Sequence, residues 1–195
     1  MLITLSQKFH SWTTGWRVII LLIADALMMG YIMPAAGAIM ALAANASVLP
    51  LDLMFFYTPA EAFAMIEKYG DAGRDIYMKI ELTADIIYPI VYTLFYGLLL
   101  SWLFQRAFRP GSRMMNYNVM PVGAWIFDLL ENIGIVSMLS MYPSQPAIIA
   151  WLTMLFGSLK WLSFLVTIGL VLYGLVRAAL NGFRKQTETQ PLRGV

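Results

Sequence analysis

Four long runs of apolar residues dominate the chain, and short polar segments separate them. The runs cover approximately residues 16–42, 80–104, 119–141 and 148–176. Each is long enough to cross a hydrocarbon core of about 30 Å as an α-helix, which needs about 20 residues. Because backbone polar groups in lipid must be satisfied internally, runs of this length favour helices over strands. The pattern predicts one all-α domain, a polytopic membrane protein with a four-transmembrane-helix bundle.

Composition agrees with this interpretation, because the chain is 60% hydrophobic and only 12% charged. Soluble domains are about 45–50% apolar and about 25% charged. The absence of cysteine excludes disulfides, thiolate metal sites and thiol redox chemistry. The net charge of +2 gives no support for a nucleic-acid partner. The first apolar run is also much longer than the core of a signal peptide, about 7–15 residues, so we expect it to be retained as a span.

The basic residues predict the orientation of the spans. Nine of them lie in the N-terminal segment, the second connection and the C-terminal segment: Lys8, Arg17, Arg106, Arg109, Arg113, Arg177, Arg184, Lys185 and Arg193. The first connection has three basic and five acidic residues, and the third, 142–146, has no charge. The positive-inside rule therefore predicts that both termini are cytoplasmic, with residues 177–195 as a cytoplasmic tail. We expect a location in a bacterial inner membrane.

The first connection contains a predicted helix over residues 59–69. Thr58 is a suitable N-cap, Pro59 suits the first helical position, and Glu61 completes a capping box. Gly70 supplies a stop, and we expect a turn between helices over residues 70–74. This helix would lie on the extracytoplasmic face, either as an interfacial helix or as a lid over a cavity between the spans.

Several ionisable residues fall inside the predicted spans: Asp25, Glu81, Asp85, Asp128, Glu131 and Lys160. A charged side chain at the bilayer centre costs at least about 2.5–3.5 kcal/mol, so these residues are expected to face one another or water inside the bundle. The acids outnumber the single lysine. Some acids must therefore be protonated, hydrated or bound to a cationic ligand, and each of these outcomes implies a polar cavity.

In the second span the polar residues share one helix face, because they recur every three or four positions. They are Glu81, Asp85, Tyr88, Tyr92 and Tyr96. Pro89 lies in the same helix and lacks a backbone N–H, so it is expected to kink the helix and to free a carbonyl group near Asp85.

The third and fourth spans carry the other polar patch. Asp128, Glu131 and Asn132 lie on one face of the third span, and Lys160 is central in the fourth. Because these positions fall at similar depth, we expect an ion pair between Lys160 and one of the two carboxylates. Gly157 shares the lysine's face and would allow the two helices to approach closely.

No set of residues indicates a catalytic site, so the sequence favours a protein that is not an enzyme. The single histidine, His10, lies in the N-terminal segment without an expected partner, which argues against haem, zinc and serine-hydrolase chemistry. No phosphate-binding glycine loop is present. We therefore expect neither a cofactor nor a metal.

Three motifs carry a family resemblance: Tyr57-Thr-Pro59, Gly70-x-x-Gly73-Arg74-x-x-Tyr77 and Phe127-Asp-Leu-Leu-Glu-Asn132. Together they resemble a group of uncharacterised bacterial four-span membrane proteins, and the resemblance covers most of the chain from residue 51 to 143. It implies a fold and no particular activity.

A weaker likeness is to the EXPERA domain of sterol isomerases and the sigma-2 receptor. It rests on Asp25 followed by Pro34 in the first span, and on Glu81 followed by Pro89 in the second. This likeness implies a cavity for an amphiphilic amine or a sterol-like ligand. It does not imply the isomerase reaction, because the isomerase's histidine has no counterpart in this sequence.

The leading hypothesis is an acidic intramembrane cavity that binds a cationic or amphiphilic small ligand, with proton-coupled transport as an extension. The residues predicted to hold the ligand or a proton are Asp25, Glu81, Asp85, Tyr88, Tyr92, Asp128, Glu131, Asn132 and Lys160. Four helices form a narrow bundle, so a transport route would require a homo-oligomer or a large tilt between helices. The alternative is a non-catalytic scaffold subunit of a membrane complex, and the third hypothesis is an intramembrane lipid-modifying enzyme.

Overall fold

The structure is a computed structural model that describes the backbone of residues 2–189 and the side chains of residues 2–182. These residues form helices and connections and contain no strand, which confirms the all-α prediction. The elements are α1 (Leu2–Trp12), α2 (Gly15–Leu27), the π-helix η1 (Met28–Ile32), α3 (Met33–Ala44), the 3-10 helix η2 (Leu51–Leu53), α4 (Pro59–Lys68), α5 (Gly70–Glu81), α6 (Ala84–Ala107), the 3-10 helix η3 (Arg113–Val119), α7 (Met120–Met141) and α8 (Ala147–Thr189).

Four helical segments are long and apolar enough to cross a membrane, as the sequence predicts. They are Gly15–Ala44, Gly70–Ala107, Arg113–Met141 and Ala147–Gly182. The second segment starts ten residues before the apolar run at 80, because it includes α5, a helix that the hydropathy pattern assigned to the first connection. The pattern missed α5 because its exposed side carries charged pairs such as Lys79 with Asp75. Helix α8 also runs well past its apolar part and includes much of the segment expected as a tail.

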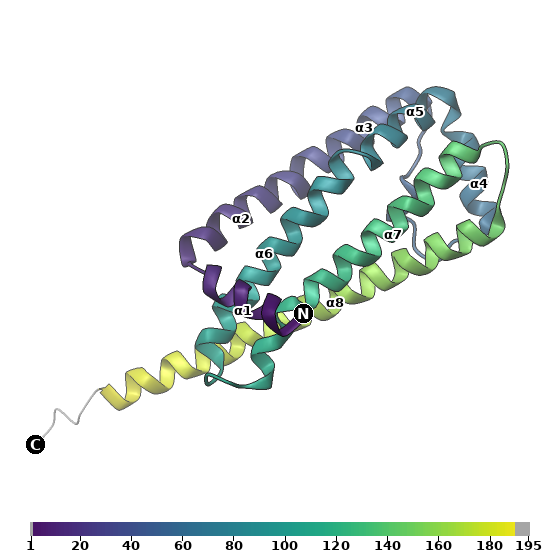
Figure 1. Cartoon of the computed structure of the whole chain (residues 1–195). Helices are drawn as coiled ribbons and strands as arrows, with labels where there is room; N and C mark the ends of the chain where they lie inside the picture. Colours follow the sequence, from purple (N-terminus) through teal and green to yellow (C-terminus); the bar gives the residue numbers. More distant parts are fainter. Residues whose placement is uncertain (1, 190–195) are drawn as a thin grey trace, which may run out of the picture.

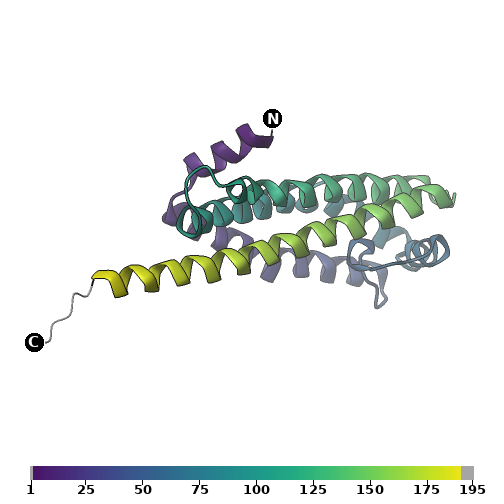
Figure 2. The ribbon, with the colours of Figure 1, turned by 90° about the horizontal axis from the view of Figure 1, so that it is seen from below.

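Helix α6 is central to the arrangement of the spans. The first span (α2, η1 and α3) packs along α6 and α5, whereas α8 packs against α7 and α6. Figure 1 shows α2 and α3 on one side of α6, with α7 and α8 on the other. In Figure 2, α8 extends beyond the end of the bundle where α1 lies. The first and fourth spans therefore both pack against α6 but not extensively against each other.

The first span is one continuous helix in which the π turn η1 links α2 to α3. Thr14 caps its start by accepting a hydrogen bond from the backbone N–H of Arg17. It ends at Asn45, which has φ 48° in the left-handed region that favours asparagine or glycine. Most of its large apolar side chains are exposed, such as Ile23 and Leu42. That exposure is expected where the surroundings of a helix are lipid rather than water.

The connection before the second span folds as predicted around Thr58. The carboxylate of Glu61 accepts a hydrogen bond of 2.7 Å from the backbone N–H of Thr58, and the hydroxyl of Thr58 accepts one from the N–H of Glu61. The hydrogen bonds from Thr58 hold the pKa of Glu61 below its usual value. The capping box and the helix that follows it are therefore confirmed.

The expected turn over residues 70–74 is shorter than predicted. Only Gly70 adopts a positive φ, of 62°, and α5 begins at that residue. Gly73 lies inside α5 because its lack of a side chain lets the helix pack on α3, where a Cβ would lie 3.1 Å from the Cβ of Ala44. Next to the turn, burial raises the pKa of the Tyr69 phenol, which donates a hydrogen bond to the carbonyl of Leu49. The loop before α4 is thus tied to the bundle.

The N-terminal segment is also structured, as helix α1, which packs against η3 and α6. Its Phe9 is buried against Gly97, where a Cβ would lie 2.8 Å from the phenylalanine ring. The expectation that His10 has no partner is wrong, because its Nε2 lies 3.0 Å from the carbonyl oxygen of Met115. Asn118 joins the same junction by donating to the carbonyl of Ser6 and to the hydroxyl of Ser101. These contacts fix α1 across one end of the bundle (Figure 1).

Candidate functional site

A cavity of about 500 Å³ lies between the first span, α5, α6, α7 and α8. The first span contributes an apolar wall of Met29, Met33, Pro34, Gly37 and Met40. Trp161 and Phe164 of α8 continue this apolar surface on the opposite side. The cavity is therefore mostly apolar where the first and fourth spans border it.

The polar wall of the cavity comes from η2, α5, α6 and α7, and from Lys160 of α8. Its charged residues are Asp52, Glu81, Asp85, Asp128 and Lys160. Tyr77, Tyr88 and Tyr92 add phenol groups from α5 and α6. Four carboxyl groups and one amine thus share a single cavity whose other walls are hydrophobic.

The structure brings six of the nine predicted site residues to this cavity: Glu81, Asp85, Tyr88, Tyr92, Asp128 and Lys160. The remaining three, Asp25, Glu131 and Asn132, are buried but do not line it. Asp25 lies on the buried side of α2, one turn before the cavity wall formed by Met29. Glu131 and Asn132 contact residues that do line the cavity: Glu131 pairs with Lys160, and Asn132 donates a hydrogen bond to the backbone carbonyl of Asp85.

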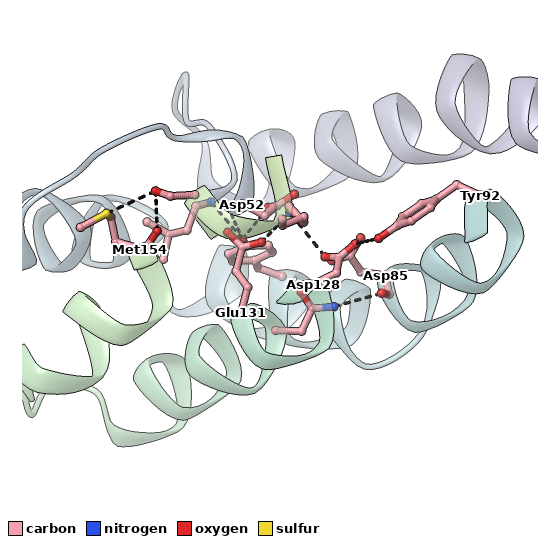
Figure 3. Close-up of polar contacts among 11 residues, drawn as sticks. Asp52, Asp85, Tyr92, Asp128, Glu131 and Met154 are labelled. Atoms are coloured by element: carbon pink, nitrogen blue, oxygen red, sulfur yellow. Dashed lines mark hydrogen bonds and ion pairs between the residues drawn. The ribbon is translucent and has the colours of Figure 1, made fainter. Parts of the chain in front are cut away.

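Lys160 forms the predicted ion pair, but with two carboxylates instead of one. Its Nζ lies 2.5 Å from Oε2 of Glu131 and 3.4 Å from Oδ1 of Asp128. The other oxygen of Asp128 accepts a hydrogen bond of 2.8 Å from the hydroxyl of Tyr92, which reaches it from α6 (Figure 3). Gly157 makes room for this cluster, because a Cβ at that position would overlap the Glu131 carboxylate. Both carboxylates that pair with the lysine thus come from α7.

Asn132 forms a hydrogen bond with the backbone of α6. Pro89 lies inside α6 and has no N–H to donate to the carbonyl of Asp85, four residues earlier. The side-chain Nδ2 of Asn132 donates to this carbonyl oxygen at 3.0 Å. The expectation of a free carbonyl near Asp85 is therefore correct, and a neighbouring helix satisfies it.

The predicted polar stripe of the second span is divided between two helices. Glu81 ends α5, the chain breaks helical geometry at Leu82 and Thr83, and Asp85 lies in the first turn of α6. Both carboxyl groups still line the cavity. Tyr96, at the far end of the stripe, packs its ring against Phe164 at 5.2 Å between centroids and does not line the cavity.

Asp52 is the charged cavity residue that the sequence interpretation missed. It lies in η2, within the connection before α4, and its Oδ1 accepts a hydrogen bond of 2.8 Å from the hydroxyl of Tyr77. The same hydroxyl accepts from the backbone N–H of Leu51 at 2.9 Å. A single acid between two leucines outside the apolar runs offers no sign that it folds back over the spans. Tyr77 holds η2 in place and so brings Asp52 to the cavity.

Two buried carboxyl oxygens at the cavity lack a partner. Glu81 and Asp85 are only 1% and 5% exposed, and within residues 2–182 neither Oε2 of Glu81 nor Oδ2 of Asp85 has a hydrogen-bond partner. Buried polar atoms are paired in the great majority of cases, because leaving one unpaired costs about 1–3 kcal/mol. These two oxygens mark the part of the cavity where a donor would be most favourable.

The described part of the chain contains no group of three or more His, Asp or Glu side chains arranged to hold a metal ion. Comparison with known proteins finds no match: no family model, no curated protein and no solved structure matches the chain. The geometry of the cavity is therefore the basis for the functional proposal.

Proposed function

We propose that the protein is a membrane-embedded binding protein whose cavity takes a small amphiphilic ligand with a cationic head. The main support for the proposal is the excess of acidic over basic groups at the cavity. Four carboxyl groups line the cavity and Glu131 lies directly behind it, whereas the only amine is Lys160. Because Asp128 and Glu131 already occupy that amine, no lysine or arginine pairs with Asp52, Glu81 or Asp85 among residues 2–182.

A cationic head would be most favourable beside Glu81 and Asp85. An ammonium group has only donors, and it would supply the hydrogen bonds that the two unpartnered oxygens lack. Hydrogen bonds between charged partners are about twice as strong as neutral ones, and more so away from water. The ligand head is therefore assigned to the junction of α5 and α6.

The apolar walls support an amphiphile over a small hydrophilic cation. The first span contributes methionine and proline side chains to the cavity lining, and α8 adds Trp161 and Phe164. Methionine side chains adapt to hydrophobic groups of different shape. An alkyl or ring system extending from the head would remove this surface from contact with water.

The proposed setting is a bacterial inner membrane with both termini in the cytoplasm, based on the distribution of lysine and arginine. Within that setting, acids that can exchange a proton for a cation would allow proton-coupled transport as an extension of binding. The resemblance to bacterial four-span proteins supports the setting and does not name a ligand.

A scaffold role is the second candidate, and the Lys160 cluster favours it. The cluster joins α7 to α8 through two carboxylates and fixes how these helices pack. Such a role needs the cluster but does not need the unpartnered acids at Glu81 and Asp85. Substitutions at the two places therefore separate the candidates.

The test is a binding measurement with a defined probe. Tritiated decylamine is titrated onto the protein in phosphatidylcholine nanodiscs, and empty nanodiscs give the background. We expect saturable binding that unlabelled decylamine displaces and decanol, which lacks the charge, does not. Asp85→Asn should weaken binding by about 10–100-fold, because a hydrogen bond to a charged group is worth about 1.5–3 kcal/mol.

The matched control is Glu67→Gln, which neutralises an exposed acid on α4 outside the cavity and should leave binding unchanged. The proposal is wrong if the wild-type protein shows no saturable binding of decylamine. It is equally wrong if Asp85→Asn and Glu67→Gln bind the amine as tightly as the wild type does.

A further inference from the structure

A second hollow, of about 400 Å³, lies at the other end of the bundle, between the end of α1, the first turns of α2, and α6. Its lining residues are Trp12, Arg17, Ile20, Leu21, Leu94 and Leu98. All except Arg17 are apolar, and Trp12 and Ile20 are 49% and 43% exposed. The hollow is therefore a hydrophobic groove on the outside of the spans with one cation in it.

The guanidinium of Arg17 is held at this groove but is not neutralised. Its Nη1 donates a hydrogen bond of 2.7 Å to the carbonyl oxygen of Trp12, the last residue of α1. No carboxylate forms an ion pair with it among the side chains of residues 2–182. A guanidinium has five N–H donors in a planar fork that suits phosphate, so most of them remain available.

The whole end of the bundle around the groove lacks acids. The described segments 2–24, 86–127 and 161–182 contain no aspartate or glutamate. The same segments contain six basic residues: Lys8, Arg17, Arg106, Arg109, Arg113 and Arg177. Figure 1 shows that α1 and the connection between α6 and α7 lie together at this end. An anionic group arriving there meets attraction from several sides and repulsion from none of these segments.

We propose that this groove binds an anionic phospholipid, with one acyl chain along the apolar wall and the phosphate on Arg17. Basic pockets between transmembrane helices are known to bind anionic head groups. The position of α1 fits this role, since Leu2, Ile3 and Trp12 are exposed, as in a helix that lies in the membrane interface. This places Arg17 at the depth of the lipid phosphates and the groove below it at the depth of the acyl chains.

The test counts lipids bound to the purified protein by native mass spectrometry. Delipidated protein in micelles is equilibrated with phosphatidylglycerol or with phosphatidylcholine that has the same acyl chains. We expect one phosphatidylglycerol to be retained at least about fivefold more strongly than phosphatidylcholine, the factor expected from one basic residue near an anionic surface. Arg17→Gln should abolish this preference. Glycerol phosphate, which has the charge without the chains, should not compete.

Two further variants separate the groove from general surface charge. Arg109→Gln removes an exposed cation at the same end but outside the groove, and it should keep at least half of the preference. Leu94→Trp fills the groove without changing any charge, and it should release the lipid. Equal losses for Arg17→Gln and Arg109→Gln would overturn the proposal, as would full retention in Leu94→Trp or equal binding of the two lipids. None of these outcomes depends on the acidic cavity.

Discussion

Replacing Lys160 with methionine should destabilise the bundle strongly, although the two side chains are similar in length. Among the side chains of residues 2–182, Lys160 is the one cation that pairs with Asp128 and Glu131, so the change leaves two buried carboxylates side by side. With an effective dielectric constant of about 20, the attraction at the observed 2.5 Å and 3.4 Å is about 7 and about 5 kcal/mol. Most of this gain offsets the cost of removing three charges from water.

The loss expected on breaking such a cluster is smaller than the Coulomb energy but still large. Removing one partner of a buried pair costs about 3–5 kcal/mol, because it leaves charge without compensation. We expect Lys160→Met to lower the free energy of unfolding by about that amount. The double variant Glu131→Gln/Lys160→Met should recover a large part of the loss, because it removes one of the two uncompensated charges.

The assay is equilibrium unfolding by sodium dodecyl sulfate in mixed micelles, followed by far-ultraviolet circular dichroism. Lys79→Met is the matched control, since Lys79 makes an ion pair of 2.6 Å with Asp75 in which both side chains are more than half exposed. Exposed pairs contribute about 0–1 kcal/mol, so this variant should unfold almost as the wild type does. The same unfolding free energy for Lys160→Met and Lys79→Met would refute the reasoning, and so would a double variant less stable than Lys160→Met.

Two other predictions use the same unfolding assay. Asn132→Leu leaves the carbonyl of Asp85 without a donor and should cost about 1–3 kcal/mol; the cost should fall when Pro89→Ala restores a backbone N–H to α6, and an undiminished cost would show that the carbonyl is not the cause. Gly157→Ala adds a methyl group where the Glu131 carboxylate lies and should cost about 1–3 kcal/mol, whereas Gly30→Ala, with nothing within 4 Å, should cost nothing. Equal stability of these two glycine variants would contradict the proposed contact.

The sequence predicts the features of this fold that depend on local chemistry. Apolar runs of sufficient length become helices, because lipid leaves the backbone no other partner. Thr58 and Glu61 form a capping box because their spacing alone suffices for it. The ion pair of Lys160 is predictable because unpaired charge is costly inside a membrane. Pro89 likewise implies a carbonyl without its helical partner, although the sequence does not identify Asn132 as the donor.

The rest depends on contacts between distant segments, which a single sequence does not reveal. Asp52 reaches the cavity because Tyr77, 25 residues away, binds η2. His10 finds its partner at Met115, 105 residues away. Helix α5 escapes the hydropathy pattern because one of its faces is charged while the other packs on α3 through Gly73. Three of the nine predicted site residues are buried but do not line the cavity. The sequence predicts that they face the interior of the bundle, but it does not show which part of the interior they reach.

The π turn η1 in the first span makes the orientation of α3 depend on the number of residues in that helix. A turn closed by i→i+5 hydrogen bonds holds one residue more than an α-helical turn, so η1 is equivalent to a one-residue insertion. One residue corresponds to a rotation of about 100° around a regular helix axis. Without the extra residue, α3 would be turned by that angle relative to α2, and Gly37 and Met40 would leave the cavity wall. The number of residues between Asp25 and Met40, and not only their identity, thus sets the shape of the cavity.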